Sequence, residues 1–145
     1  MTTNKKVPKG YQITGLVRRQ SHAEGITSSG AAPVLGDLNN SSLISHHVQQ
    51  SGIIFHTATA DHLPSVLAVL DGIKAGAQEG KETIFIHTSG TSVLEDRAMG
   101  AFKSNKIYHD NDPIEIDSAA DSAPNREIDL AIIKARKELE GRRRS

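Results

Sequence analysis

Four short runs rich in β-branched and aliphatic residues alternate with longer segments in which apolar residues recur at three- and four-residue spacing. The runs lie at Tyr11–Val17, Pro33–Leu35, Ile53–His56 and Thr83–His87. Their apolar residues are continuous rather than alternating with polar ones, which is typical of strands buried on both faces of a parallel sheet. Strands that alternate with helices predict an α/β fold, with a Rossmann-like parallel sheet and helices on both faces.

The helical periodicity is clearest between Asp61 and Ala77. Asp61 is the expected N-cap, and Pro64 falls in the first turn, where proline is tolerated. The apolar face comprises Leu63, Val66, Leu67, Leu70, Ile73 and Ala77. This spacing predicts one amphipathic helix that packs on the sheet.

Two further helices are predicted on either side of it. The first follows the second strand, with Ser41 or Ser42 as its N-cap and Gly52 at its C-terminal cap. The second covers about 125–140, with Ile128, Ala131, Ile132, Ala135 and Leu139 on one face. We expect the polar stretch 20–32 to be a Gly/Ser-rich connection and the acidic stretch 95–126 to be a long loop with short helical turns.

The length and charge of the chain limit its organisation and its partners. With 145 residues it is expected to form one domain, at 11–140, after a disordered N-terminus at 1–10 and before a basic tail at 141–145. Seventeen basic residues balance seventeen acidic ones, which argues against nucleic acid or an anionic membrane as a partner. Without cysteine, signal sequence or apolar span, the chain is expected to be cytoplasmic.

Polar residues follow each expected strand. They are Arg18-Arg19, Gly36-Asp37-Leu38, Thr57–Asp61 and Thr88-Ser89-Gly90. In doubly wound sheets, ligands bind beyond the carboxyl ends of the strands. These four segments are therefore the candidate site.

Three strings, in this order and spacing, resemble the extended or atypical short-chain dehydrogenase/reductases, particularly the NAD-dependent epimerase/dehydratase-like and NmrA-like NAD(P)-binding proteins. They are Ile13-Thr14-Gly15-Leu16-Val17-Arg18, Val34-Leu35-Gly36-Asp37-Leu38 and Ile86-His87-Thr88-Ser89-Gly90-Thr91. The resemblance spans about 11–140. It implies that the strands are the second to fifth of a nucleotide-binding sheet.

The resemblance implies a cofactor-binding role for several residues. Arg18 would contact a 2′-phosphate, which would favour NADP over NAD. The alternative is a solvated arginine at a strand end. Asp37, with Leu38, would hold the adenine ring; the alternative is an aspartate that caps the following turn. Thr57 and Ala58 would lie along the cofactor.

At the nicotinamide end, the resemblance implies that Thr88 lines the cofactor. Ser89, or alternatively Thr91, would be the catalytic hydroxyl. A plain turn of hydroxyl residues is the competing interpretation. The expected ligands are thus NADP or NAD and an unknown small molecule, while the oligomeric state is left open.

Two departures from the family pattern stand against full activity. No G-x-G-x-x-G can be written anywhere in the chain, so the loop that cradles the pyrophosphate is absent. The family's first strand would precede Tyr11, and we expect the chain to be truncated. No Tyr-x-x-x-Lys exists either; Asp129 and Ile133 occupy the places of that pair.

The sequence therefore predicts an NAD(P)-binding protein that resembles epimerase/dehydratase-type oxidoreductases. The alternative is a non-enzymatic NADP-sensing or protein-interaction module. The sequence leaves open whether the chain is catalytically active. The seven histidines include the pairs His46 with His47 and His56 with His62, but neither has acidic or cysteine companions at ligand spacing, so no metal site is expected.

Overall fold

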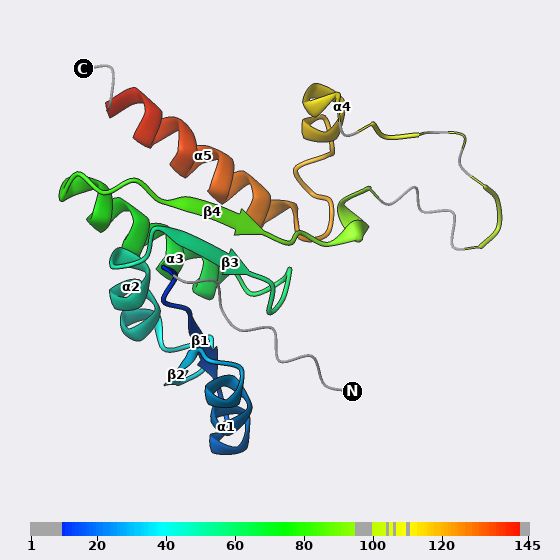
Figure 1. Cartoon of the computed structure of the whole chain (residues 1–145). Coiled ribbons are helices and arrows are strands. Elements are labelled where there is room, and N and C mark those ends of the chain that lie inside the picture. The colour runs from blue at the N-terminus through cyan, green and yellow to red at the C-terminus, as the bar shows by residue number, and fades with distance from the viewer. Residues whose placement is uncertain (1–9, 95–99, 104, 106, 110, 143–145) are drawn as a thin grey trace.

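The computed structural model describes residues 10–94, 100–103, 105, 107–109 and 111–142. The strands are β1 (Thr14–Val17), β2 (Ala32–Leu35), β3 (Ile53–His56) and β4 (Ile84–His87), and the helices are α1 (Gln20–Ser28), α2 (Ser41–Gln49), α3 (Leu63–Gln78), α4 (Pro113–Asp117) and α5 (Arg126–Arg142), with a 3₁₀ turn η1 (Thr91–Leu94) (Figure 1). The order of elements confirms the α/β class.

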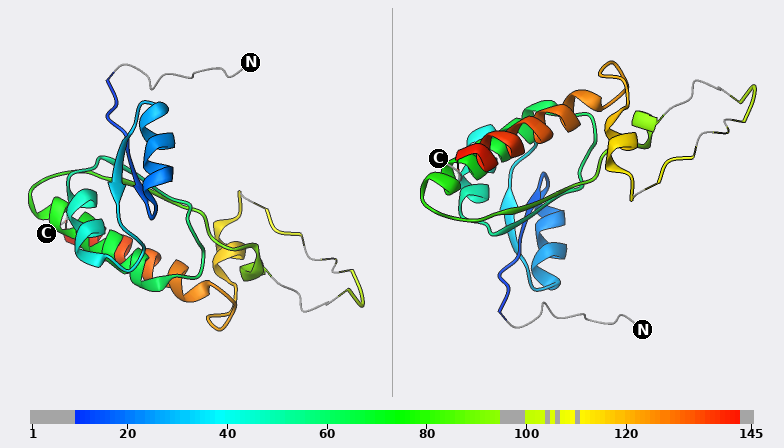
Figure 2. Two further views of the ribbon diagram at one scale, coloured as in Figure 1. Left: turned by 90° about the horizontal axis from the view of Figure 1, so that it is seen from below. Right: turned by 90° about the horizontal axis from the view of Figure 1, so that it is seen from above.

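The described strands form two separate parallel pairs instead of one sheet. β1 pairs with β2, from Thr14↔Ala32 to Val17↔Leu35, and β3 pairs with β4, from Ile53↔Ile84 to His56↔His87. The two pairs run across one another in Figure 2. A single continuous sheet was expected; in the described part of the chain no strand lies between the pairs to hydrogen-bond to both.

The core lies on one face of the β3–β4 pair. Helices α3 and α5 lie along this face (Figure 1), and Ile54 and Phe85 pack against their buried residues, among them Val66, Leu70, Ile73, Ile128 and Ala135. The opposite face carries Ile53, Phe55, Ile84 and Ile86, which are 43–68% exposed. The expected cover of helices on both faces is therefore wrong for this pair, because both helices that cover it lie on the same side.

Helix α2 packs on α3 through an unusually close contact at Gly72. A Cβ atom at this position would lie 2.6 Å from the backbone oxygen of Ser45 and 2.7 Å from Cγ1 of Val48. Gly76, one turn later, would meet the oxygen of Gln49 at 3.3 Å. The small residues of α3 therefore let two helix backbones approach each other closely.

Several helices begin or end at other residues than the sequence predicted. Residues 20–28 form α1 where a polar connection was expected; Ala23 is buried, and Ile26 covers Gly15 of β1. The cap of α2 is Asn40, and its C-cap is Gln50 rather than Gly52. His62, not Asp61, caps α3, since its ring accepts a hydrogen bond from the backbone N–H of Ser65. Pro64 lies in the first turn, as predicted.

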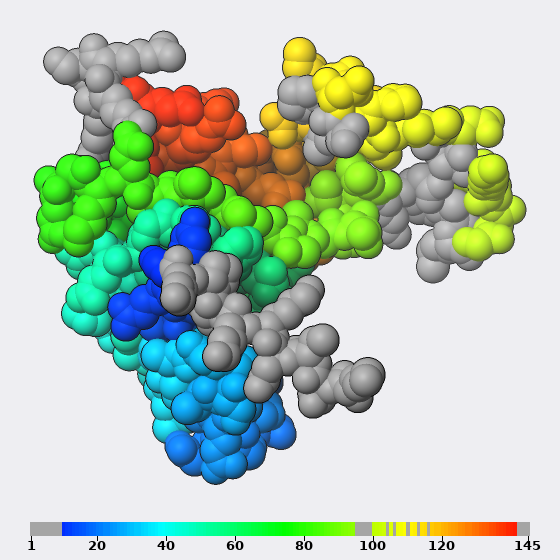
Figure 3. Space-filling view, viewed as in Figure 1, coloured from blue at the N-terminus to red at the C-terminus, as the bar shows by residue number. Residues whose placement is uncertain are grey.

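The apolar face predicted for α5 is confirmed: Ile128 and Ala135 are buried, and the other three residues pack against them. That of α3 is partly wrong, because Leu67 is 44% exposed and Ala77 is exposed as well, while Ala68 and Val69 are buried. Around α4, the described part of 100–118 projects from the body (Figure 3). Residues 1–9 and 143–145, which include most of the expected N-terminal segment and tail, lie outside the described residues.

Candidate functional site at the carboxyl ends of the strands

The carboxyl ends of β1 and β2 bring Arg18 next to Gly36 and Asp37. Val17 and Leu35 are register partners, and the N–H of Gly36 donates to the oxygen of Val17 at 2.9 Å. The Arg18 side chain is exposed and has no hydrogen-bond or ion-pair partner among the described residues. With respect to that part of the chain, it is an unpaired guanidinium at the end of a parallel strand.

Asp37 opens a tight turn before α2. One of its carboxylate oxygens, Oδ1, accepts the N–H of Asn39 at 2.7 Å, and its own N–H donates to Oδ1 of Asn40 at 2.8 Å. This is the turn-capping bond that the alternative interpretation of Asp37 predicted. Among the residues that the structure describes, the second oxygen, Oδ2, has no donor and is left as an acceptor. Leu38, the next residue, is half-buried.

A side-chain contact joins the two strand pairs at this edge. Nε2 of His62, at the N-terminus of α3, lies 3.3 Å from Oδ1 of Asn39 in the turn after β2. The loop that follows β3 is thus held close to the turn that follows β2. This contact is the link that the structure shows between the segments after the first strand pair and those after the second.

The residues after β3 and β4 are small and exposed. Thr57 and Ala58 directly follow β3, and the N–H of Thr88 donates to the oxygen of His56 at 3.1 Å. The structure therefore places Thr88 next to Thr57 at the same end of the strand pair. Short side chains here leave the backbone open to a ligand.

Ser89 and Asp129 meet although they are forty positions apart in the sequence. Oγ of Ser89 donates to Oδ2 of Asp129 on α5 at 3.1 Å. Thr91 begins η1 and is exposed, without a bond to this carboxylate. Of the two hydroxyls considered, Ser89 is therefore the one joined to the α5 position where the resemblance predicts a tyrosine.

A pair of histidines, which sequence reasoning missed, lies at the ends of β3 and β4, with His56 buried and His87 half-buried. Nδ1 of His56 and Nδ1 of His87 are 3.2 Å apart, and Nε2 of His56 lies 3.1 Å from Oγ of Ser65. The sequence analysis had paired His56 with His62 instead. The available signal was that each histidine is the last residue of its strand, so parallel register makes them neighbours.

Burial lowers the pKa of both histidines. For His56 the next cause is the like charge that His87 would carry, and His62 acts in the same direction. For His87 the nearby carboxylate of Asp129 opposes the effect of burial but does not cancel it. The pair is therefore held in its neutral form over a wider pH range than exposed histidines.

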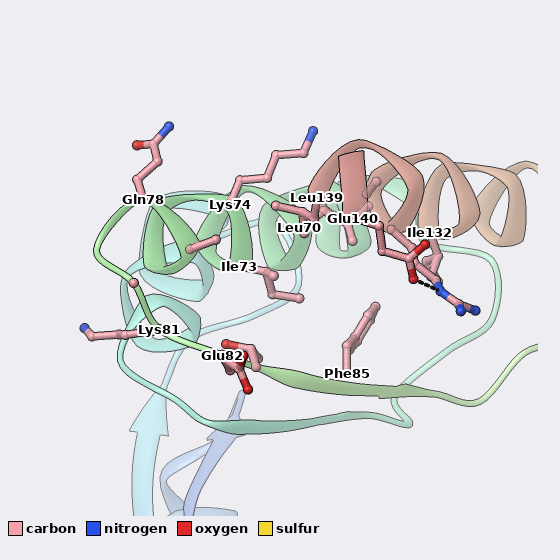
Figure 4. Close-up of a pocket in the computed structure, with 15 residues that line it drawn as sticks. Leu70, Ile73, Lys74, Gln78, Lys81, Glu82, Phe85, Ile132, Leu139 and Glu140 are labelled. Atoms are coloured by element: carbon pink, nitrogen blue, oxygen red, sulfur yellow. Dashed lines mark hydrogen bonds and ion pairs between the residues drawn. The ribbon is translucent and has the colours of Figure 1, made fainter. Parts of the chain in front are cut away.

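A cavity lies away from this edge (Figure 4). Its volume is about 600 Å³, between α3, α5 and the start of β4. Leu70, Ile73, Phe85, Ile132 and Leu139 give it an apolar lining. Charged groups on its rim bond to other charged groups; Arg136 donates to Glu140 at 2.8 Å. It offers apolar surface but no unpaired charge toward a ligand.

Within the described residues, no group of three or more His, Asp or Glu side chains is arranged to hold a metal ion. Nor does that part of the chain contain a helix both long and apolar enough to cross a membrane. Comparison with family models, with curated proteins and with solved structures yields no match. The site must therefore be judged on its own geometry.

Proposed function

We propose that this chain binds an NAD(P) dinucleotide, with NADP preferred, along the carboxyl ends of its strands. The observation that carries the proposal is the free Arg18 guanidinium next to the Asp37 turn. A guanidinium binds a phosphate through two parallel hydrogen bonds, and the open oxygen of Asp37 can accept from an adenine amino group. These are the two groups that the adenosine half of NADP presents.

The arrangement of the strands supports the same proposal. In a doubly wound dinucleotide-binding sheet, two sets of parallel strands flank a central strand, and the ligand crosses their carboxyl ends. The pairs β2–β1 and β3–β4 are each parallel and each connected through a helix, as the two flanking sets would be. The Asn39–His62 contact holds their carboxyl ends close together, where a dinucleotide could lie across both.

The Ser89–Asp129 bond favours binding without hydride transfer. In the oxidoreductases that the sequence resembles, a tyrosine phenol passes a proton while a lysine lowers its pKa. Here Asp129 accepts from Ser89, and Ile133 has no charge with which to assist it. We therefore favour an NADP-binding or NADP-sensing module over an epimerase or dehydrogenase.

The proposal is tested by titrating the 145-residue chain with NADPH and NADH and following the fluorescence of the reduced nicotinamide. Because no glycine-rich loop holds the pyrophosphate, we expect Kd values in the micromolar range or weaker. Arg18→Ala should weaken NADPH binding by about 10- to 100-fold, since a charged hydrogen bond contributes about 1.5–3 kcal/mol. NADH binding should change little.

Arg136→Ala is the matched control, because it removes the same charge at the distant cavity and should leave both affinities unchanged. Arg18→Lys should retain part of the preference, since lysine keeps the charge but loses the planar fork. The proposal would be refuted if neither NADPH nor NADH binds. It would also be refuted if Arg18→Ala and Arg136→Ala weaken NADPH binding equally.

A further inference from the structure

The histidine pair at the ends of β3 and β4 has a fixed pattern of hydrogen-bond donors and acceptors. Ser65 donates its only hydroxyl hydrogen to the backbone oxygen of His62 at 2.9 Å, because that oxygen can only accept. Toward the ring of His56, Ser65 must therefore act as the acceptor. Nε2 of His56 then carries the proton, and Nδ1 of the neutral ring is an acceptor.

The same reasoning extends to His87. Its Nδ1 must donate to the bare Nδ1 of His56 across 3.2 Å, which leaves Nε2 of His87 without a proton. That Nε2 atom is buried and has no hydrogen-bond partner among the described residues. The series of hydrogen bonds from the backbone oxygen of His62 through Ser65 and His56 thus ends at one acceptor on His87, its Nε2 atom.

The geometry limits the pair to a single added proton. A proton at Nε2 of His87 leaves the Nδ1–Nδ1 bond intact. A second proton would have to enter at Nδ1 of His56, where it would break that bond and place two positive rings in contact inside the core. The first proton therefore enters at Nε2 of His87. Asp129, which accepts the hydroxyl of Ser89 two residues further along, favours positive charge on this ring.

We propose that His56 and His87 form a one-proton switch, in which protonation of Nε2 of His87 draws the Asp129 carboxylate away from Ser89. Before protonation, Oδ2 of Asp129 accepts the Ser89 hydroxyl at 3.1 Å. Afterwards, the new N–H⁺ of His87 competes for the same carboxylate, and a charged donor is the stronger one. Acidification thus releases Ser89 at the carboxyl ends of the strands.

The titratable groups that act on the pair come from the elements packed against it. His62, at the N-terminus of α3, disfavours charge on His56. Asp129 of α5 favours charge on His87. Ser65 supplies a hydroxyl but no charge. The switch does not depend on NADP, so it can be tested on the chain without a nucleotide. Its refutation would leave the proposed function untouched, and the reverse also holds.

The first test is the tautomer of each ring, read from imidazole ¹⁵N chemical shifts of the full chain at pH 8. We expect Nε2–H on His56 and Nδ1–H on His87, with single-histidine variants providing the assignments. A His87 ring that carries its proton on Nε2 at this pH overturns the proposal.

The second test is an acid titration of the same sample, with the Ser89 amide as reporter. His87 and Ser89 should shift with one common midpoint, while His56 keeps its tautomer. Asp129→Asn should lower the His87 midpoint and abolish the Ser89 response, whereas Asp71→Asn, the same change on the exposed side of α3, should do neither. Different midpoints for His87 and Ser89 in the wild-type chain overturn the proposal even if Asp129→Asn does not fold.

Discussion

Two strand–helix–strand units of this protein share one topology but differ in their core. In β1–α1–β2 the helix has 9 residues, of which only Ala23 is buried. In β3–α3–β4 the helix has 16 residues, and eight are buried. Helix α3 packs against α2 and α5, while the main neighbours of α1 among the described elements are its own strands β1 and β2. The same local order of elements thus gives very different burial, depending on how many neighbours cover the helix.

The largest contrast should come from leucine truncation. Leu70 of α3 is 6% exposed in the core, whereas Leu35 of β2 is 58% exposed. Leu70→Ala should lower the free energy of unfolding by about 2–5 kcal/mol, because it removes buried methyl groups and leaves a cavity. Leu35→Ala should cost about 0.5 kcal/mol or less. Urea denaturation followed by circular dichroism measures both, and equal costs would mean that the two units share burial equally.

A second contrast separates two helical glycines. Gly72→Ala places a Cβ atom 2.6 Å from the Ser45 oxygen, so α2 must move. We expect a net loss of about 1–3 kcal/mol, despite the better helix propensity of alanine. Gly25→Ala on α1 meets nothing within 4 Å and should raise stability by roughly 0.5–1 kcal/mol. If both variants gain stability in the same assay, α2 and α3 are not in such close contact.

A smaller contrast concerns pH. Folding lowers the pKa of His56 and His87 below the ordinary 6.5, so the unfolded chain binds more protons as the pH falls. The contribution of the pair to the free energy of unfolding is fully present above pH 6.5. It declines as the pH falls from 6.5 toward the lowered pKa values of the folded protein. Urea denaturation at a series of pH values from 8 to 5 measures it.

The control for this pH dependence lies in the other unit. Replacing His56 and His87 together by glutamine should flatten the decline, whereas His22→Gln on α1 should leave it in place. A decline that survives in the double variant would show that the pair is not its source.

The four strands were predictable because continuous apolar runs need no distant partner to be recognised. β3 was predicted with the bounds that it has, and β4 within one residue. Helix α1 was missed because its apolar signal is weak; only Ala23 is buried, and Ile26 covers its own strand. The cap of α3 was misplaced because the ring of His62 accepts the N–H of Ser65 in the folded turn. The cap of α2 was misplaced because the helix begins after Asn40, whose side chain bonds back to the N–H of Asp37 and makes no capping bond.

The candidate site divides in the same way. Position after a strand suggested Arg18, Asp37, Thr57 and Thr88 as candidates. Arg18 lies next to the Gly36-Asp37 segment and Thr88 next to Thr57, because the two strands of each pair are parallel. The Ser89–Asp129 bond and the His62–Asn39 contact could not be inferred from spacing, because each joins segments that only packing brings together. The His56–His87 contact required the register of β3 against β4.

By itself, the sequence determined the class of fold, the strands, the polar residues that follow them, and the absence of a glycine-rich loop and a Tyr-x-x-x-Lys pair. All of these depend on composition and periodicity within short stretches. Only the tertiary structure decided that the strands form two pairs, that one sheet face carries the core, and that two histidines share a hydrogen bond. These features depend on contacts between residues distant in the chain, and local periodicity does not encode such contacts.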